Sequence, residues 1–314
     1  MPALIKQESK GCIDCFGIFT RWDYLEGYIQ NYGMNNLLTR LVGIHHIWAS
    51  PSEAMTNGEA ERFSPWRPDC DENYFGWIDV IEAVLAAKGR FVMIELGAGY
   101  GRWLLSAVGV LRHLNPIDYR LIAVEAEPTH FKWLKEHMLA NEVKPENCEL
   151  INAAIGGKSG LVQFYIGNPS GWYGQAIDVN AKQRDRLSLL EKLRSAALRL
   201  ISLYYPTKVG KIWVEVIPLA PLLNKHGSID LIDLDVQGAE LEVLAPAIDS
   251  LNATTKRVHI GTHSTEIETG LREVFSRNGW ECLHDFPCFS SIMTDYGEIE
   301  FQDGLQTWAN PRLI

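Results

Sequence analysis

The sequence lacks an excess of positive charge and any long apolar run, and these two absences exclude several classes of protein. Its 314 residues contain 29 Lys and Arg against 39 Asp and Glu, which gives a net charge of −10. Nucleic-acid binders usually carry a basic face, so we expect no nucleic-acid partner. No stretch of about 18 apolar residues occurs, so we expect neither a membrane-spanning helix nor a membrane partner.

Secretory and metal-binding signatures are also scarce. The first residues, MPALIKQESKGCIDC, lack the apolar segment of a signal peptide, so we expect a cytoplasmic protein. Only six cysteines are present, and cytosolic thiols normally stay reduced. Cys12 and Cys15 form a CxxC, but no second pair at zinc-binding spacing accompanies it. We therefore interpret the cysteines as ordinary thiols and expect no metal.

What is present is typical of a globular protein with one large domain. The hydrophobic fraction is 46% and the charged fraction 22%. Residues 1–77 have irregular helical patterning followed by a loop rich in Pro, Gly and charge, which predicts an N-terminal accessory segment of helices and loops. We assign the main domain to residues 78–314, with an insertion at about 168–210.

Apolar runs alternate with helical periodicity from residue 91 onward. The runs FVMIEL, LIAVEA and IDLIDLD favour buried parallel strands, and residues 103–114 and 130–141 favour helices. Further strands are expected at 148–154, 161–166, 211–219, 256–262 and 281–284. Strands that alternate with helices predict an α/β fold with a mostly parallel sheet. Ligands of such sheets bind beyond the carboxyl ends of the strands, so residues just after each strand are the candidates.

The first strand ends in a glycine-rich turn, ELGAGYG. Glycines allow a sharp turn and close approach of a ligand, and the following helix offers free N–H groups. A dinucleotide fold would need its third glycine at Arg102, one residue later than it occurs, which disfavours an NAD-dependent oxidoreductase. The candidate cofactor-binding residues of this segment are Glu95, Gly97, Ala98, Gly99 and Gly101.

The second strand ends in VEAEP, which contains two carboxylates. Glu125 lies 24 residues after Gly101 and could accept hydrogen bonds from both hydroxyls of a ribose. We favour Glu125 for that role. Glu127 is interpreted instead as favouring the start of the next helix through the helix dipole.

The segment IDLIDLDVQGAELEVL makes a family resemblance specific. Together with ELGAGYG, VEAEP, LINAAIGGKSG and VHIGTHSTEIE, in that order, it resembles the FkbM family of methyltransferases. The resemblance spans about residues 91–286. Two positions depart from it, because Gln237 stands where many relatives have Glu, and Asp233 stands where many have Lys. The resemblance therefore implies no charge-based role at either position.

The resemblance implies a Rossmann-like class I methyltransferase fold, with a mostly parallel seven-stranded sheet and helices on both faces. It also implies S-adenosylmethionine as cofactor and methylation of a hydroxyl on a small-molecule, glycan-like or natural-product acceptor. Methylation of nitrogen and a non-catalytic cofactor-binding module are the alternatives. Beyond the glycine turn and Glu125, the implied cofactor-binding residues are Ala126, Asn152, Ala153 and Asp235.

Two residues at neighbouring strand ends are the candidate catalytic groups. His263 follows one strand, and its ordinary pKa suits proton removal near neutrality. Asp235 ends the adjacent strand and is the second candidate for the general base, although it could instead cap the following helix. Glu240 could be a helix-dipole partner, and His259 a core histidine bonded to the backbone. Asp235 and His263 could share a metal, but the spacing shows no third ligand.

The acceptor itself is not identified by any motif. Trp172 and Tyr173, flanked by glycines, suit a flat ligand and join Gln237 and His263 as candidate substrate contacts, with ordinary packing as the alternative. Residues 184–203 carry leucines at helical spacing. That helix could be a lid, a surface helix, or a subunit contact in a homo-oligomer.

Overall fold

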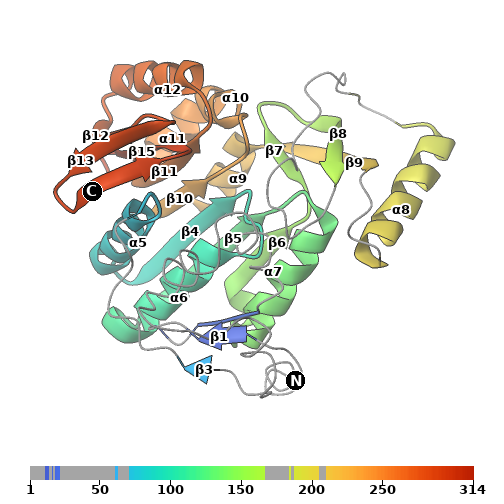
Figure 1. The fold of residues 1–314 in the computed structure, drawn as a ribbon, viewed down its shortest axis with the longest axis horizontal. Helices are drawn as coiled ribbons and strands as arrows, with labels where there is room; N and C mark the ends of the chain where they lie inside the picture. Colours follow the sequence, from blue (N-terminus) through green and yellow to red (C-terminus); the bar gives the residue numbers. More distant parts are fainter. Residues whose placement is uncertain are drawn as a thin grey trace.

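Figure 1 shows the fold of the chain in a computed structural model. The structure describes residues 11–13, 16, 18–21, 61–62, 71–166, 184, 187–204 and 210–314. Among these residues, none of the helices has both the length and the apolar character that crossing a membrane requires.

A seven-stranded sheet forms the centre of the main domain (Figure 1). Its strand order is β12-β15-β11-β10-β4-β5-β6, and β15 alone runs antiparallel to its neighbours. The strands are β4 (Arg90–Leu96), β5 (Asp118–Val124), β6 (Cys148–Ile151), β10 (Leu231–Leu234), β11 (Arg257–Thr262), β12 (Glu281–Phe286) and β15 (Gly304–Ala309). The predicted mostly parallel seven-stranded sheet is therefore confirmed.

Helices cover both faces of this sheet because its central strands are apolar on both sides. Phe91 and Met93 of β4 join one buried cluster, and Val92 and Ile94 join another. The first cluster includes side chains from α5 (Tyr74–Ala86), α6 (Arg102–Leu114) and α7 (Pro128–Ala140). The second includes side chains from α9 (Leu219–His226), α10 (Glu240–Leu244), α11 (Ile248–Thr254) and α12 (Thr265–Arg277). Successive residues of a strand thus contribute to opposite cores.

A second sheet of three strands lies beside the central one, in the order β7-β9-β8 (Figure 1). Its strands are β7 (Ala154–Gly156), β8 (Gly160–Ile166) and β9 (Gly210–Pro218). The sequence predicted a single strand over residues 148–154. That prediction was wrong, because the chain leaves the central sheet after Ile151 and enters the second sheet at Ala154. The strands predicted at 161–166 and 211–219 are present, and they belong to this second sheet.

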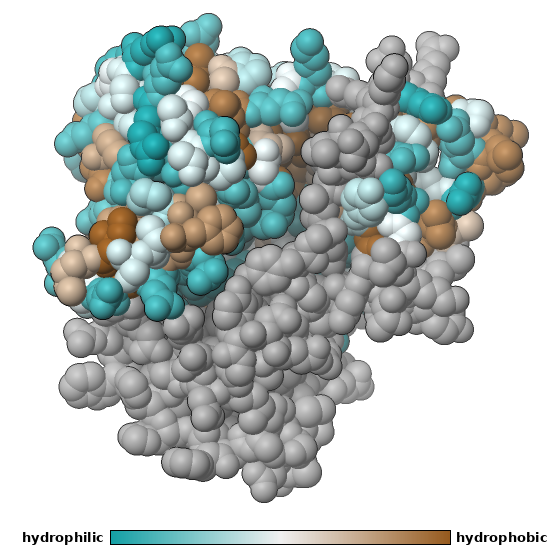
Figure 2. Space-filling model, turned by 45° about the horizontal axis from the view of Figure 1, so that its top comes forward, coloured by the Kyte–Doolittle hydropathy of each residue, from teal (hydrophilic) through white to brown (hydrophobic). Residues whose placement is uncertain are grey.

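Helix α8 (Leu189–Tyr204) packs against β9, as the hydrogen bonds between Ser195 and the backbone of Trp213 show. Leu189, Leu190 and Leu193 are exposed, and hydrophobic surface is visible at the right of Figure 2, on the side where Figure 1 places α8. The predicted helix is confirmed over most of its length. One side of α8 therefore packs on the second sheet, and another side exposes apolar residues to solvent.

Three strands near the carboxyl terminus were not predicted, namely β13 (Ser290–Thr294), β14 (Gly297–Phe301) and β15. Strand β15 is fully buried, yet its centre is the polar pair Gln306 and Thr307. Their side chains hydrogen-bond to Asp285 and Asp79, respectively. A buried strand whose polar groups are satisfied by other elements carries no apolar run for a sequence pattern to detect.

The predicted domain boundary at residue 77 falls inside α5, which begins at Tyr74. The described residues before it include β1 (Gly11–Ile13), β2 (Phe19–Arg21) and β3 (Glu61–Arg62), which pair in one small sheet. The stretch at 22–41 that has helical patterning lies outside the described residues. The part of the chain that the structure describes also contains two short 3₁₀ helices, η1 (Pro145–Asn147) and η3 (Ala245–Ala247).

Candidate functional site

The carboxyl ends of β4, β5 and β10 are joined by backbone hydrogen bonds at one edge of the sheet. The N–H groups of Gly97 and Ala98 donate to the Val124 carbonyl, and the Asp235 N–H donates to the Leu96 carbonyl. A Cβ atom on Gly97 would lie 1.9 Å from the Asp235 carbonyl oxygen. The glycine turn and Asp235 are therefore in direct backbone contact.

The glycine turn that the sequence predicted is made by residues with left-handed backbone conformation. Gly97, Gly99 and Gly101 have φ values of 78°, 54° and 78°, which residues with a Cβ atom rarely adopt. The turn leads into α6, whose first N–H groups include those of Trp103 and Leu104. Both donate to the buried Glu95 carboxylate at 3.2 Å. Glu95 thus caps α6 from inside the sheet. Its burial and the nearby Asp233 carboxylate raise the pKa of Glu95 well above its ordinary value.

Glu125 lies beside this turn, and its side chain is buried. Its two carboxylate oxygens accept hydrogen bonds from the N–H groups of Gly99 and Glu127, each at 2.7 Å. Burial outweighs these hydrogen bonds and raises the pKa of Glu125 to about 8. Glu127 accepts from the N–H of His130 at 2.6 Å and is the N-cap of α7. The interpretation of Glu127 as a helix-start residue is confirmed.

Asn152, another predicted cofactor residue, contacts the backbone of Glu125. Asn152 follows β6, and its side-chain amide donates to the carbonyl of Glu125 at 2.8 Å and of Ala126 at 3.3 Å. Ala126 and Ala153 are buried. These hydrogen bonds join the backbone after β5 to the residue after β6, so Asn152 lies beside the Glu125–Ala126 backbone.

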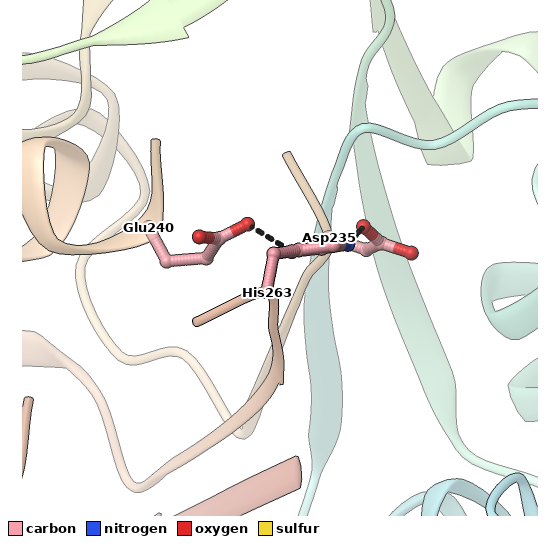
Figure 3. A group of neighbouring side chains, drawn as sticks. All are labelled: Asp235, Glu240 and His263. Atoms are coloured by element: carbon pink, nitrogen blue, oxygen red, sulfur yellow. Dashed lines mark hydrogen bonds and ion pairs between the residues drawn. The ribbon is translucent and has the colours of Figure 1, made fainter. Parts of the chain in front are cut away.

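A second group of side chains lies after β10 and β11, as Figure 3 shows. The Nδ1 atom of His263 is 2.9 Å from Oε1 of Glu240, and its Nε2 atom is 3.4 Å from Oδ1 of Asp235. Asp303, in the turn before β15, has its Oδ1 atom 3.9 Å from the same Nε2. The predicted pair Asp235 and His263 is brought together, with two further carboxylates beside it.

The Asp235 side chain is hydrogen-bonded by a neighbouring residue and does not cap a helix. Helix α10 has Ala239 as its N-cap, so the alternative in which Asp235 caps this helix is wrong. The side-chain amide of Gln237 donates to Oδ1 of Asp235 at 2.9 Å. Gln237 has a positive φ of 53°, which turns the chain sharply before Gly238. The predicted substrate contact Gln237 therefore adjoins Asp235.

The pKa of His263 differs from the ordinary value that the sequence-based prediction assumed. Burial disfavours its charged form, but the hydrogen bond to Glu240 and the charges of Asp235, Glu240 and Asp303 outweigh burial and raise the pKa of His263 to about 9. The imidazole is therefore mostly protonated at neutral pH, contrary to the expected ordinary pKa. Its Nε2 atom is shielded from solvent and makes no hydrogen bond within the described residues.

His259 is a core histidine, as one interpretation proposed, but its partner is a side chain. Its Nδ1 atom is 2.7 Å from Oδ2 of buried Asp79 in α5. Burial opposes the charged form of each residue. The hydrogen bond between them and their charges outweigh it, raising the pKa of His259 and lowering that of Asp79. The expected bond to the backbone is therefore replaced by a buried ion pair that ties α5 to β11.

Two residues of the site were missed or discounted in the sequence-based prediction. Glu240 was interpreted only as a helix-dipole partner, although it belongs to the GAE segment that carries the family resemblance. Asp303 has no sequence signal, because it is 40 residues beyond His263 and precedes an unpredicted strand. The predicted substrate contacts Trp172 and Tyr173 lie outside the described residues.

The sequence matches known proteins over most of the main domain. Residues 95–285 match the family model described as the methyltransferase FkbM domain. A protein of Jannaschia sp. (strain CCS1) with a provisional methyltransferase name is 26% identical over 249 residues, which are 79% of this chain and 81% of the relative.

Solved methyltransferase structures show weaker similarity. The methyltransferase FkbM from Methylobacillus flagellatus KT is 12% identical, with 87% of this chain and 69% of that chain covered and a TM-score of 0.41. The precorrin-6y C5,15-methyltransferase from Geobacter metallireducens GS-15 is also 12% identical. There the coverage is 74% of this chain and 86% of that chain, with a TM-score of 0.38.

Proposed function

The chain belongs to the FkbM methyltransferase family, and we propose that it transfers a methyl group from S-adenosylmethionine to a hydroxyl oxygen. The acceptor would be a small molecule, a sugar or a natural product. The observation that carries the proposal is the placement of Glu125 and Asp235 on either side of one glycine turn, where each contacts that turn directly.

The residues beside the glycine turn fit the ribose of this cofactor. Each oxygen of an ionised carboxylate has two lone pairs, and each Glu125 oxygen is hydrogen-bonded by a backbone N–H in the structure. The remaining lone pairs can accept two neighbouring hydroxyl groups. The three left-handed glycines add no side chain that would block a flat ligand, and the side chains of Ala98 and Tyr100 between them are buried. When bound, the cofactor supplies an activated methyl group on a sulfonium sulfur.

At the acceptor end, Asp235 is better placed than His263 to take up the hydroxyl proton. The Asp235 side chain is 53% exposed, whereas the Nε2 atom of His263 is shielded from solvent. The acceptor oxygen would gain the methyl carbon while its proton passes to Asp235. Correct positioning of donor and acceptor supplies much of the rate, and a general base adds about 10²–10⁴-fold. His263 then holds Asp235 in place by charge.

Methyl-labelled S-adenosylmethionine, incubated with a panel of hydroxylated acceptors and their amine analogues, tests this function. We expect label in O-methyl products and the release of one S-adenosylhomocysteine per methyl group. Label confined to amines would replace the proposal with methylation of nitrogen. Tight binding of S-adenosylhomocysteine without any transfer would favour a non-catalytic binding module.

The raised pKa of Glu125 gives a pH-dependent prediction for cofactor binding. Its carboxyl group holds a proton below about pH 8, and the protonated form cannot accept from both ribose hydroxyls. The affinity for S-adenosylhomocysteine should therefore rise about ten-fold between pH 7 and pH 9, as the ionised fraction grows. Isothermal titration calorimetry across this range measures the effect.

The variant Glu125→Gln should bind more weakly and lose this pH dependence. The exposed Glu142→Gln serves as the matched control and should keep the slope of the wild-type chain. The ionisable groups of the ligand titrate identically in every experiment. A difference in pH dependence between the variants therefore comes from residue 125. Parallel pH curves for the wild type and Glu125→Gln would contradict the role of Glu125.

A further inference from the structure

The group around His263 has the composition of a metal site. The ligand atoms that Asp235, Glu240 and His263 offer all lie within 4.8 Å of one another, and Asp303 adds a third carboxylate. We propose that His263, Asp235 and Asp303 bind a divalent transition-metal ion, with Glu240 orienting the imidazole. The role of the ion in catalysis rests on the proposed methyl transfer. Binding of the ion does not, since it needs neither cofactor nor acceptor.

One distance in this group matches the separation that a metal ion imposes on two of its ligands. Two atoms bonded to one ion at about 2.1 Å in a tetrahedral arrangement are about 3.4 Å apart. The Nε2 atom of His263 and the Oδ1 atom of Asp235 are separated by 3.4 Å. Asp303 is slightly farther from Nε2, at 3.9 Å, and its 41% exposed side chain can move into coordination.

The His263 imidazole is held in one orientation by its neighbours, as metal-binding histidines commonly are. Glu240 is fully buried, and its Oε1 accepts from the Gly238 N–H and faces Nδ1 of His263. Metal-binding histidines commonly donate their second N–H to a carboxylate, which fixes the tautomer and leaves the other nitrogen for the metal. Nε2 is the nitrogen so directed here, and it has no hydrogen-bond partner among the described residues.

An imidazole nitrogen combined with carboxylates suits Mn²⁺, Fe²⁺ or Zn²⁺ better than Ca²⁺ or Mg²⁺, which prefer oxygen ligands alone. The two aspartates are about half exposed, so the ion would keep positions open toward solvent. An acceptor hydroxyl bound there becomes more acidic. Its proton would pass to the Asp235 oxygen that does not bind the metal, so the residue keeps the role proposed above.

Titration of the full chain with Mn²⁺, after treatment with a chelator and dialysis, tests the site. The electron paramagnetic resonance signal of free Mn²⁺ should fall along a saturable curve with one ion per chain, and Zn²⁺ should displace the bound ion. Asp303→Asn should weaken Mn²⁺ binding at least about ten-fold. The control Asp295→Asn, an exposed aspartate in the β13–β14 turn, should bind like the wild type.

Two outcomes would overturn the site. One is the lack of saturable binding of either ion below about 1 mM, and the other is unchanged Mn²⁺ binding in both Asp303→Asn and His263→Gln. Thermal denaturation of each variant shows that it is folded. Absent metal binding would leave the proposed methyl transfer standing. Conversely, absent transfer by a chain that binds Mn²⁺ would reject only the proposed function.

Discussion

Replacement of Asp235 by Asn should lower the turnover number of methyl transfer by about 10²–10⁴-fold, the range that a positioned general base contributes. Asn keeps the size of the side chain and an oxygen that can accept from Gln237. It cannot take up a proton, and it is a poorer metal ligand than a carboxylate. Cofactor affinity should change little, because the Asp235 contact with the glycine turn is made by its backbone carbonyl.

The measurement compares turnover of wild-type and variant chains on a hydroxylated acceptor, with calorimetric titration of S-adenosylhomocysteine on the same samples. Asp249→Asn, an exposed aspartate of α11, is the matched control and should retain full turnover. A loss of less than about ten-fold in Asp235→Asn would remove the residue from the chemistry. A parallel loss of cofactor affinity would instead assign it to cofactor binding, where the sequence also placed it.

The central sheet could be predicted because strands that are buried on both faces need runs of apolar residues, which are visible in the sequence. Strands β4 and β10 are buried on both faces, so they appear as apolar runs that stop where the candidate site residues begin. The position after a strand therefore identified Gly97, Glu125, Asp235 and His263 without any structure. Their meeting at one sheet edge follows from the parallel arrangement.

The remainder of the acceptor end could not be predicted because its partners come from distant or polar segments. Asp303 precedes β15, whose buried polar side chains hide it from hydrophobic patterns. The pKa of His263 depends on three carboxylates, of which only Asp235 was expected near it. A residue type and its place after a strand thus predict proximity to the site. They do not predict the charge state that neighbouring elements impose.

The acidic net charge acquires a more specific meaning from this arrangement. Asp235, Glu240 and Asp303 surround His263 at one end of the site, and Glu125 lies across the glycine turn. Carboxylates brought this close repel one another unless a cation or proton compensates them. The imidazolium of His263 partly compensates the group at neutral pH. A divalent ion bound at Nε2 would displace the proton from that nitrogen and compensate the carboxylates in its place. A polyanionic acceptor would meet unfavourable charge here.

Replacement of Gly97 by Ala should destabilise the protein by about 4 kcal/mol or more and abolish cofactor binding. Two costs combine at this position. The φ of +78° is unfavourable for any residue with a Cβ atom, at about 1–2 kcal/mol. The added Cβ would also lie 1.9 Å from the carbonyl oxygen of Asp235, so the ends of β4 and β10 would have to separate. That separation displaces the glycine turn and Asp235 together.

Gly89→Ala separates these two costs. Gly89 has nearly the same φ, +75°, but a Cβ atom added there would meet no other atom within 4 Å, so this variant carries only the backbone cost. Urea denaturation of both variants should therefore show Gly89→Ala weakened by about 1–2 kcal/mol with normal affinity for S-adenosylhomocysteine. Equal stability of the two variants would mean that β4 and β10 are not held in the close contact on which the proposed site depends.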